Sequence, residues 1–307
     1  MTFILSMNIR GLGTSQKNLA LKNVFFANQH KFILIQETMQ NTPVSISYYR
    51  KMLPTWHMVS VEANGQSGGL AVLRDLEWIK GKEYKCFVGI LISASIRGKD
   101  SPINILNMYA PYKNRINFWE KFFASEIVDI EYLMIVGDLN VMLSTDEIWG
   151  NNRKKDPLAA RIRYELLHRN LADINPPKMK PTWDNGRNER AYIEKRLDRF
   201  ILHESIIDRL GMPFTSIGND YISNHRPIFL GWREKGFRKG YPFKFNRLCL
   251  ENSDFNEAII RQWKELSSRE KMPPFLTFKD KMESIQKFVK DWQYKKRQQN
   301  RSTLREI

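Results

Sequence analysis

A carboxylate and an amide follow a strongly apolar stretch in the middle of the chain. Residues Tyr132–Val136 are all apolar or aromatic, and Gly137 ends this run just before Asp138 and Asn140. Such a run is typical of a buried β-strand. Because side chains alternate along a strand, Asp138 and Asn140 would lie on the same side of the chain at its end. Gly, Asp and Asn are also ordinary turn residues, so this segment alone is equally compatible with a simple turn.

Four other short segments carry polar groups of related kinds. They are M-N-I-R-G at 7–11, I-Q-E-T at 35–38, R-L-D-R at 196–199 and S-N-H-R-P-I at 223–228. Phosphodiester hydrolysis needs a cation on the phosphate, an oriented water and help for the leaving oxygen. A hard cation such as Mg²⁺ prefers carboxylate and amide oxygens and keeps several waters. Glu37 and Asn8, each at the end of a predicted strand, could supply such oxygens, although Glu37 taken alone could be a surface carboxylate.

In this order, the five segments resemble the endonuclease/exonuclease/phosphatase superfamily. The closer likeness is to the endonuclease domain of plant non-LTR (LINE-type) retrotransposons, and it covers about residues 2–232. S-G-G at 67–69 and P-T-W at 181–183 share it, and Arg10 stands where abasic-site nucleases of the superfamily carry an acid. The resemblance implies Mg²⁺-dependent cleavage of DNA, with Mn²⁺ as an alternative ion, by a nick that leaves a 3′-hydroxyl.

The same resemblance implies roles for individual residues. Glu37 matches the principal metal ligand, and Asn8 matches the amide that supports it. Asp138 matches the residue that orients or deprotonates the attacking water, and Asn140 the one that holds phosphate and nucleophile in line. Tyr109 matches a tyrosine that hydrogen-bonds the phosphate, although a half-buried strand tyrosine is the plain alternative.

A histidine and a carboxylate complete the implied site. His225 matches the histidine that protonates or stabilises the transition-state phosphate, and Asp198 matches the carboxylate that sets its tautomer, as in a catalytic dyad. Two positions depart from the family pattern. Asn224 replaces an aspartate, and Tyr112 stands where an asparagine is frequent. Asn224 removes one negative charge beside the metal, so the resemblance implies reduced activity that Asn224→Asp would raise.

Short strands must bring these residues together. Apolar runs and alternation predict strands that end or begin at the polar groups, at 2–9, 32–36, 103–109, 132–136, 197–202 and 227–232. Helical spacing predicts helices at about 15–28, 115–128 and 157–169. These elements favour an α/β fold with a C-terminal helical appendage. The resemblance implies that the fold is a DNase-I-like four-layer sandwich, in which two mostly antiparallel sheets pack face to face between helices.

The net charge of the chain indicates what kind of partner it binds. The 307 residues carry 49 Lys+Arg against 33 Asp+Glu, a net charge of +16. This excess favours nucleic acid or an anionic surface as a partner, although an ordinary basic, soluble protein remains an alternative. Two cysteines cannot build a disulfide framework, and no apolar stretch is long enough to span a membrane. We expect an intracellular protein that is located in the nucleus and has no membrane as a partner.

The composition changes at about residue 234. We expect a nuclease-like domain at 1–234 and a basic helical appendage at 235–307, which carries +9 of the net charge. Phe255, Ile259 and Trp263 share one predicted helix face, and Ile285 and Val289 share another, which predicts a helical hairpin. The chain has no Y-x-D-D signature, so a downstream reverse-transcriptase domain would be a partner absent from this chain.

Two other functions stay open. The superfamily also contains phosphatases that act on small phosphoesters, although the basic charge disfavours them here. The chain could instead be a catalytically weakened remnant that binds nucleic acid without cutting it, for which Asn224 is the main support.

Overall fold

The computed structural model describes residues 2–13, 15–27, 30–64, 67–98, 102–150, 153–188, 191–218, 223–232, 247–267 and 274–305. The chain separates into two compact units, residues 1–240 and 241–307. The boundary expected at residue 234 lies outside the described residues, so it stays a prediction. None of the helices in the described ranges is long and apolar enough to cross a membrane.

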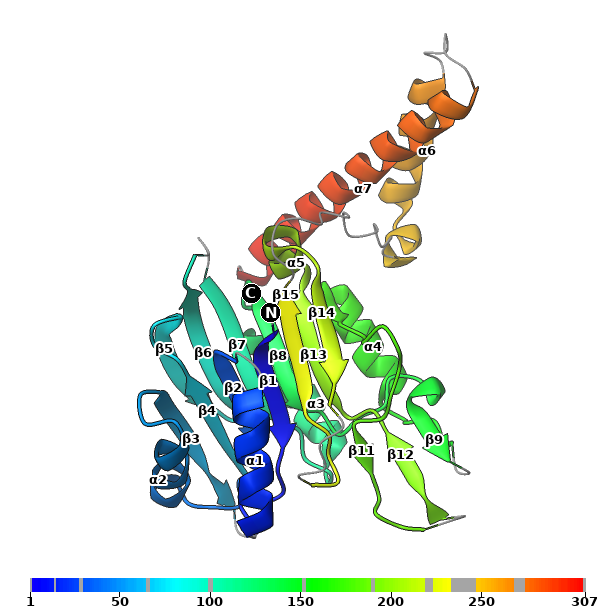
Figure 1. The fold of residues 1–307 in the computed structure, drawn as a ribbon. Coiled ribbons are helices and arrows are strands. Elements are labelled where there is room, and N and C mark those ends of the chain that lie inside the picture. The colour runs from blue at the N-terminus through cyan, green and yellow to red at the C-terminus, as the bar shows by residue number, and fades with distance from the viewer. Residues whose placement is uncertain are drawn as a thin grey trace. The chain divides into compact units, whose positions relative to one another are not determined.

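Two six-stranded sheets form the first unit (Figure 1). The first sheet has the strand order β14 (Pro213–Ile217), β15 (Ile228–Trp232), β1 (Thr2–Asn8), β2 (Phe32–Gln36), β4 (Ser67–Arg74) and β3 (His57–Asn64). The second has the order β10 (Leu171–Asp173), β13 (Asp198–His203), β8 (Leu133–Asp138), β7 (Pro102–Tyr109), β6 (Gly89–Ile96) and β5 (Ile79–Cys86). The neighbours β1 and β2, and likewise β7 and β8, run parallel, and the other neighbours in these two sheets are antiparallel.

Helices cover the outer face of each sheet (Figure 1). On the first sheet, α1 (Ser15–Ala27) and α2 (Thr42–Met52) pack against the odd-numbered residues of β1 and β2, such as Leu5 and Ile33. On the second, α3 (Arg115–Phe123) and α4 (Ala159–His168) pack against residues such as Leu106 and Ile135. The expected four-layer α/β sandwich is therefore confirmed.

The opposite faces of the strands meet between the sheets, and three buried polar side chains join them there. The Gln36 side-chain nitrogen donates to Asn107 Oδ1 at 2.6 Å and to Ser6 Oγ at 3.1 Å. Asn107 Nδ2 donates to the backbone carbonyls of Ile35 at 3.1 Å and Ala71 at 3.0 Å. Because unpaired buried amides are costly, these bonds fix how β7 of one sheet sits on β2 and β4 of the other.

A third, small sheet was not expected. It has the order β11 (Trp183–Asp184), β12 (Ile193–Lys195) and β9 (Ile148–Gly150). The first unit also contains the helical elements η1 (Glu126–Asp129), η2 (Thr145–Glu147) and α5 (Glu204–Leu210). The helix expected to reach Val128 ends at Phe123, and a short 3₁₀ turn follows it.

The second unit is helical. It contains η4 (Arg247–Glu251), α6 (Ser253–Ser267) and α7 (Pro274–Arg305). Phe255 of α6 is fully buried against Trp292 of α7, with ring centroids 4.9 Å apart. Val289 and Cys249 are the other buried members of this small core. The expected apolar faces pack only in part, because Trp263 is 39% exposed.

Candidate active site

The predicted site residues meet because four strands end, and a fifth begins, at one edge of the sandwich. Asn8 ends β1, and Glu37 directly follows β2, which lies beside β1. In the other sheet, Asp138 ends β8 and is paired in register with Tyr109 of β7 and with Asp198 of β13. Both sheets therefore contribute to the same polar cluster.

Asn8 links the two sheets at this cluster. Its side-chain nitrogen donates to Glu37 Oε1 at 3.1 Å and to Asp138 Oδ2 at 3.0 Å. Its side-chain oxygen accepts from the backbone N–H of Arg10 at 3.1 Å. In this arrangement the amide nitrogen, and not the oxygen, faces the carboxylates, so Asn8 orients Glu37. Its role as a metal ligand stays a prediction.

Asn140 holds the other oxygen of Asp138. The backbone N–H of Asn140 donates to Asp138 Oδ1 at 3.0 Å, and its side-chain nitrogen donates to the Ala110 carbonyl at 2.7 Å. Asn140 adopts a left-handed backbone with φ +48°, and Glu37 and Arg10 do the same with φ +51° and +45°. Such conformations cost about 1–3 kcal/mol each for residues other than glycine, and they concentrate at functional sites.

The histidine–aspartate pair is formed. His225 Nδ1 lies 3.0 Å from Asp198 Oδ2, and His225 Nε2 lies 3.8 Å from Asp138 Oδ2. Ser223 Oγ accepts from the backbone N–H of His225 at 3.0 Å and donates to the Asn8 carbonyl at 2.7 Å. The imidazole is thus held between two carboxylates, with Nε2 toward Asp138.

Burial and charge shift the pKa values of this group in opposite directions. Burial raises the pKa of Asp138 well above that of an exposed aspartate, while attraction to His225 opposes the rise. Burial lowers the pKa of His225, but the charges of Asp198 and Asp138 overcome it, so the net shift is upward. Near neutral pH the imidazole therefore carries a proton. Burial also raises the pKa of Tyr109, and its hydrogen bond to Glu37 adds to the rise.

Asn224 lies beside this cluster but bonds elsewhere. Its side-chain nitrogen donates to the Asp184 carbonyl at 2.8 Å, and its side-chain oxygen accepts from the Arg10 guanidinium at 3.1 Å. Arg10 Nε in turn lies 3.8 Å from Glu37 Oε2. Tyr112, the other departure from the family pattern, is 77% exposed.

Sequence reasoning missed two supporting residues. Thr182 is fully buried, and its hydroxyl accepts from the backbone N–H groups of Leu197 and Asp198 at 2.9 and 3.0 Å. It thereby fixes the start of the strand that carries Asp198. Ser223 fixes His225 in a comparable way. Both residues stand inside noted motifs, P-T-W and S-N-H. The bonds of Thr182 reach backbone groups 15 and 16 residues away, so its own motif leaves no local signal for them.

Three of these side chains could hold a metal ion. Asp138, Asp198 and His225 each offer one ligand atom, and these atoms lie within 4.8 Å of one another. Asp198 Oδ1 is buried without a hydrogen-bond partner among the residues that the structure describes. Glu37 offers a further carboxylate at the edge of the cluster, with a side chain that is 10% exposed. The donor set fits a divalent cation.

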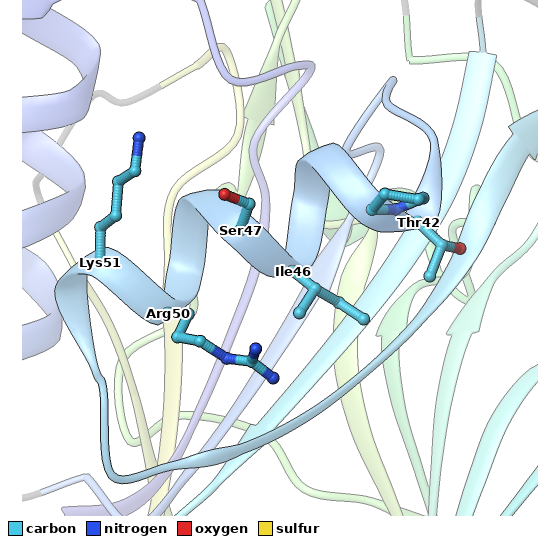
Figure 2. Close-up of a pocket in the computed structure, with 6 residues that line it drawn as sticks. Thr42, Ile46, Ser47, Arg50 and Lys51 are labelled. Atoms are coloured by element: carbon cyan, nitrogen blue, oxygen red, sulfur yellow. The ribbon is translucent and has the colours of Figure 1, made fainter.

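The structure also has a surface pocket, and the residues that line it do not belong to the polar cluster. Figure 2 shows its lining side chains, all of which belong to α2, among them Thr42, Ile46 and Arg50. It shares no residue with the polar cluster, and it has no part in the chemistry considered below.

Comparison with solved structures gives the fold independently. The endonuclease domain of TRAS1, a telomere-specific non-LTR retrotransposon, is 15% identical and superposes with a TM-score of 0.54 over 74% of this chain and 95% of that one. An AP endonuclease from Archaeoglobus fulgidus is 16% identical, with a TM-score of 0.57 over 75% of this chain and 98% of that one. A 3′-5′ exonuclease from Neisseria meningitidis is 15% identical, with a TM-score of 0.55 over 75% of this chain and 98% of that one. The first unit has a DNase-I-like fold.

No protein-family model and no curated protein matches the chain. At these identities the likeness is one of fold. The superfamily expected from the motifs, and within it the closeness to plant LINE-type elements, stay predictions.

Proposed function

We propose that this protein is a divalent-metal-dependent endonuclease that hydrolyses DNA phosphodiester bonds. The observation that carries the proposal is the joint position of Asp138, His225 and Glu37 at one edge of the sandwich, linked by Asn8 and Asp198. A carboxylate with a raised pKa, a protonated imidazole and a carboxylate at the edge of the group supply the three functions that phosphodiester hydrolysis needs.

Each side chain has a part in the reaction. Asp138 accepts a proton from the attacking water, whose oxygen bonds to phosphorus while the P–O3′ bond breaks. His225 Nε2–H donates to a phosphate oxygen, and Asp198 keeps the imidazole protonated and oriented. The 3′ oxygen takes up a proton from solvent, and Asp138 returns its proton to solvent. The products are a 3′-hydroxyl and a 5′-phosphate.

Glu37 is the main ligand of the cation in this proposal. Mg²⁺ keeps several waters when bound to protein, and Glu37 lies at the edge of the cluster, whereas Asp138, Asp198 and His225 are at most 5% exposed. A bound cation would offset the negative charge of the phosphate. Mn²⁺ is the alternative ion, because carboxylate and water ligands suit it as well.

DNA is the proposed substrate for two reasons. The net charge of +16 favours a polyanion. Proteins that share the fold include a retrotransposon endonuclease domain and an AP endonuclease. By analogy with the first, we propose a retrotransposon-derived nuclease that acts in the nucleus, with a reverse-transcriptase domain as its partner.

Nicking of supercoiled plasmid DNA tests the proposal. The wild-type protein should nick with Mg²⁺ and stop with a chelator, and DNA ligase alone should reseal the nick, because it requires a 3′-hydroxyl and a 5′-phosphate. Glu37→Gln and Asp138→Asn should each lower the rate by about 10²-fold or more. Glu77→Gln, which changes an exposed carboxylate, is the matched control and should nick normally. Nicking by Asp138→Asn at the wild-type rate would refute the mechanism.

One alternative function has its own support. Asn224 occupies the position of a family carboxylate, so the chain could bind DNA without cutting it. A folded wild-type protein that binds DNA but nicks with neither Mg²⁺ nor Mn²⁺ would favour this binding remnant.

A further inference from the structure

Arg10 is held beside Glu37 by its backbone. The N–H groups of Ile9 and Gly11 donate to the carbonyls of Gln36 at 3.0 Å and Glu37 at 2.7 Å, so the chain after β1 follows the end of β2. Arg10 itself has φ +45°, an uncommon conformation for a residue with a long side chain. The fold therefore maintains a locally unfavourable backbone that keeps Arg10 at the edge of the candidate site.

The guanidinium is held on one side and open on the other. It donates to Asn224 Oδ1 at 3.1 Å, and its Nε lies 3.8 Å from Glu37 Oε2. The Arg10 side chain is nonetheless 52% exposed. Since a guanidinium has five N–H donors in a planar fork, the exposed part can bind a phosphate through two parallel hydrogen bonds.

The orientation of Asn224 is determined by its neighbours. Its side-chain nitrogen donates to the Asp184 carbonyl, and that bond requires an N–H donor. The side-chain oxygen must then face Arg10. A neutral oxygen holds the guanidinium without cancelling its charge. An aspartate here would form an ion pair with Arg10, and it could not donate to the Asp184 carbonyl.

The surrounding charges explain why such a cation is useful. Glu37, Asp138 and Asp198 place three carboxyl groups at the edge where a phosphodiester must enter, and His225 opposes them from inside the cluster. Lys17, whose Nζ donates to the Arg10 carbonyl at 3.1 Å, is a further cation near Glu37. An anionic substrate needs positive charge at the entrance to such a group.

We propose that Arg10, held in place by Asn224, binds the phosphate of the nucleic-acid backbone at this site. The proposal rests on the proposed function, since it names the group that receives the substrate. It gives Asn224 a purpose of its own in this chain. Asn224 is then a positioning residue matched to Arg10, and not merely a lost carboxylate.

DNA binding without any metal tests this directly. Wild-type protein, Arg10→Gln, Arg10→Lys and Asn224→Asp are titrated with a fluorescent DNA duplex in chelator at several salt concentrations, after circular dichroism has shown that each is folded. Each phosphate contact contributes about −0.9 to the slope of log K against log[salt]. Arg10→Gln should lower the magnitude of the slope by about 1 and weaken binding about tenfold at low salt. Arg10→Lys should retain the slope, because it keeps the charge.

Two comparisons separate the explanations. Arg50→Gln removes an exposed arginine of α2 and is the control for loss of charge alone. An equal loss of slope in Arg50→Gln, or no loss in Arg10→Gln, would overturn the proposal. Asn224→Asp should weaken binding and slow nicking. Faster nicking by Asn224→Asp would instead restore the interpretation of a lost metal-site carboxylate.

These experiments distinguish a failure of the proposed nuclease function from a failure of the inference about Arg10. If the wild type does not nick but Arg10→Gln still lowers the salt slope, phosphate binding by Arg10 stands and the nuclease proposal fails. If the wild type nicks and the slope does not change, the nuclease proposal stands and the inference about Arg10 fails.

Discussion

Replacing Arg199 with methionine should strongly destabilise the first unit. Arg199 is 1% exposed, and its guanidinium donates to Glu147 Oε1 at 2.8 Å, Asp173 Oδ2 at 2.7 Å and the Val141 carbonyl at 3.0 Å. Methionine has a comparable length but no charge. In the variant, the guanidinium of Arg196, which already bonds Glu147 and Asp173, would have to balance the charge of both carboxylates.

The magnitude follows from the burial of this network. Removing one partner of a buried ion pair costs roughly 3–5 kcal/mol, because the remaining charge is left uncompensated. Burial alone would raise the pKa of Glu147 and of Asp173, but attraction to Arg199 holds both below their ordinary values. A lowered carboxyl pKa contributes stability above the unfolded pKa, and that contribution is lost as pH falls through the folded pKa. The difference between wild type and variant should therefore shrink in acid.

Urea unfolding of the full chain at neutral pH measures the free energy of unfolding. We expect a loss of about 3–5 kcal/mol for Arg199→Met, and a smaller loss at acid pH. The control is Arg161→Met, which breaks an exposed pair with Glu165 on α4 and should change stability by about 0.5 kcal/mol or less. A loss under about 1 kcal/mol for Arg199→Met would refute the reasoning, since it would mean that the two carboxylates tolerate the lost charge.

Three further predictions concern other buried positions. Burial lowers the pKa of His30 from 6.5 to about 4, so the unfolded chain takes up a proton that the folded one resists, and stability should fall as pH drops from about 6.5 toward 4. Urea titrations should show that His30→Phe removes this loss, and an unchanged pH dependence would exclude His30 as its source. Gly137 has φ +133°, and a Cβ there would lie 2.1 Å from the Met108 carbonyl oxygen, so Gly137→Ala should cost about 3 kcal/mol or more in urea unfolding, whereas a neutral effect would contradict the geometry. Phe255→Ala should cost the second unit about 3–5 kcal/mol by removing the contact with Trp292. Hydrogen exchange should then show α6 and α7 opening while the β-strands of the first unit stay protected, and protected helices would indicate that this core is not what stabilises them.

The buried strands could be predicted from the sequence because their apolar patterns are strong. The strand expected at 32–36 matches β2, Phe32–Gln36, and the one expected at 103–109 differs from β7 by one residue. The strand expected to end at Val136 continues to Asp138, because Gly137 can adopt the backbone that keeps the pairing with β7. The carboxylate thus ends the strand instead of following it.

Other elements left weaker signals. β5 is almost wholly exposed along I-K-G-K-E-Y-K-C, so it shows no apolar alternation. The strands of the third sheet have two or three residues each, too few for any periodicity. The helix α2 did leave a signal, because Asn41 caps it and Pro43 follows at its first turn.

The candidate site could be predicted only where its residues follow strong strands. Glu37 and Asp138 were identifiable in this way, and Asp198 was identifiable because it stands at the start of a predicted strand. The structure brings the three residues to one edge. The contact between Arg10 and Asn224 joins residues that are 214 positions apart. Neither residue has a local sequence pattern that reveals the other, so this contact could be found only in the three-dimensional structure.

The pairing of β1 with β15 has a consequence for the order of assembly during synthesis. Thr2–Ser6 pair with residues 228–231, so the first strand made is completed by the last strand of its sheet. His225 also lies just before β15. The ribosome must therefore release nearly the whole first unit before Asn8 and His225 can meet, and protease protection of arrested nascent chains should appear only after Trp232 has emerged. Until Trp232 has emerged, a nascent chain with this topology cannot assemble the proposed site, even while it remains close to the nucleic acid that encodes it.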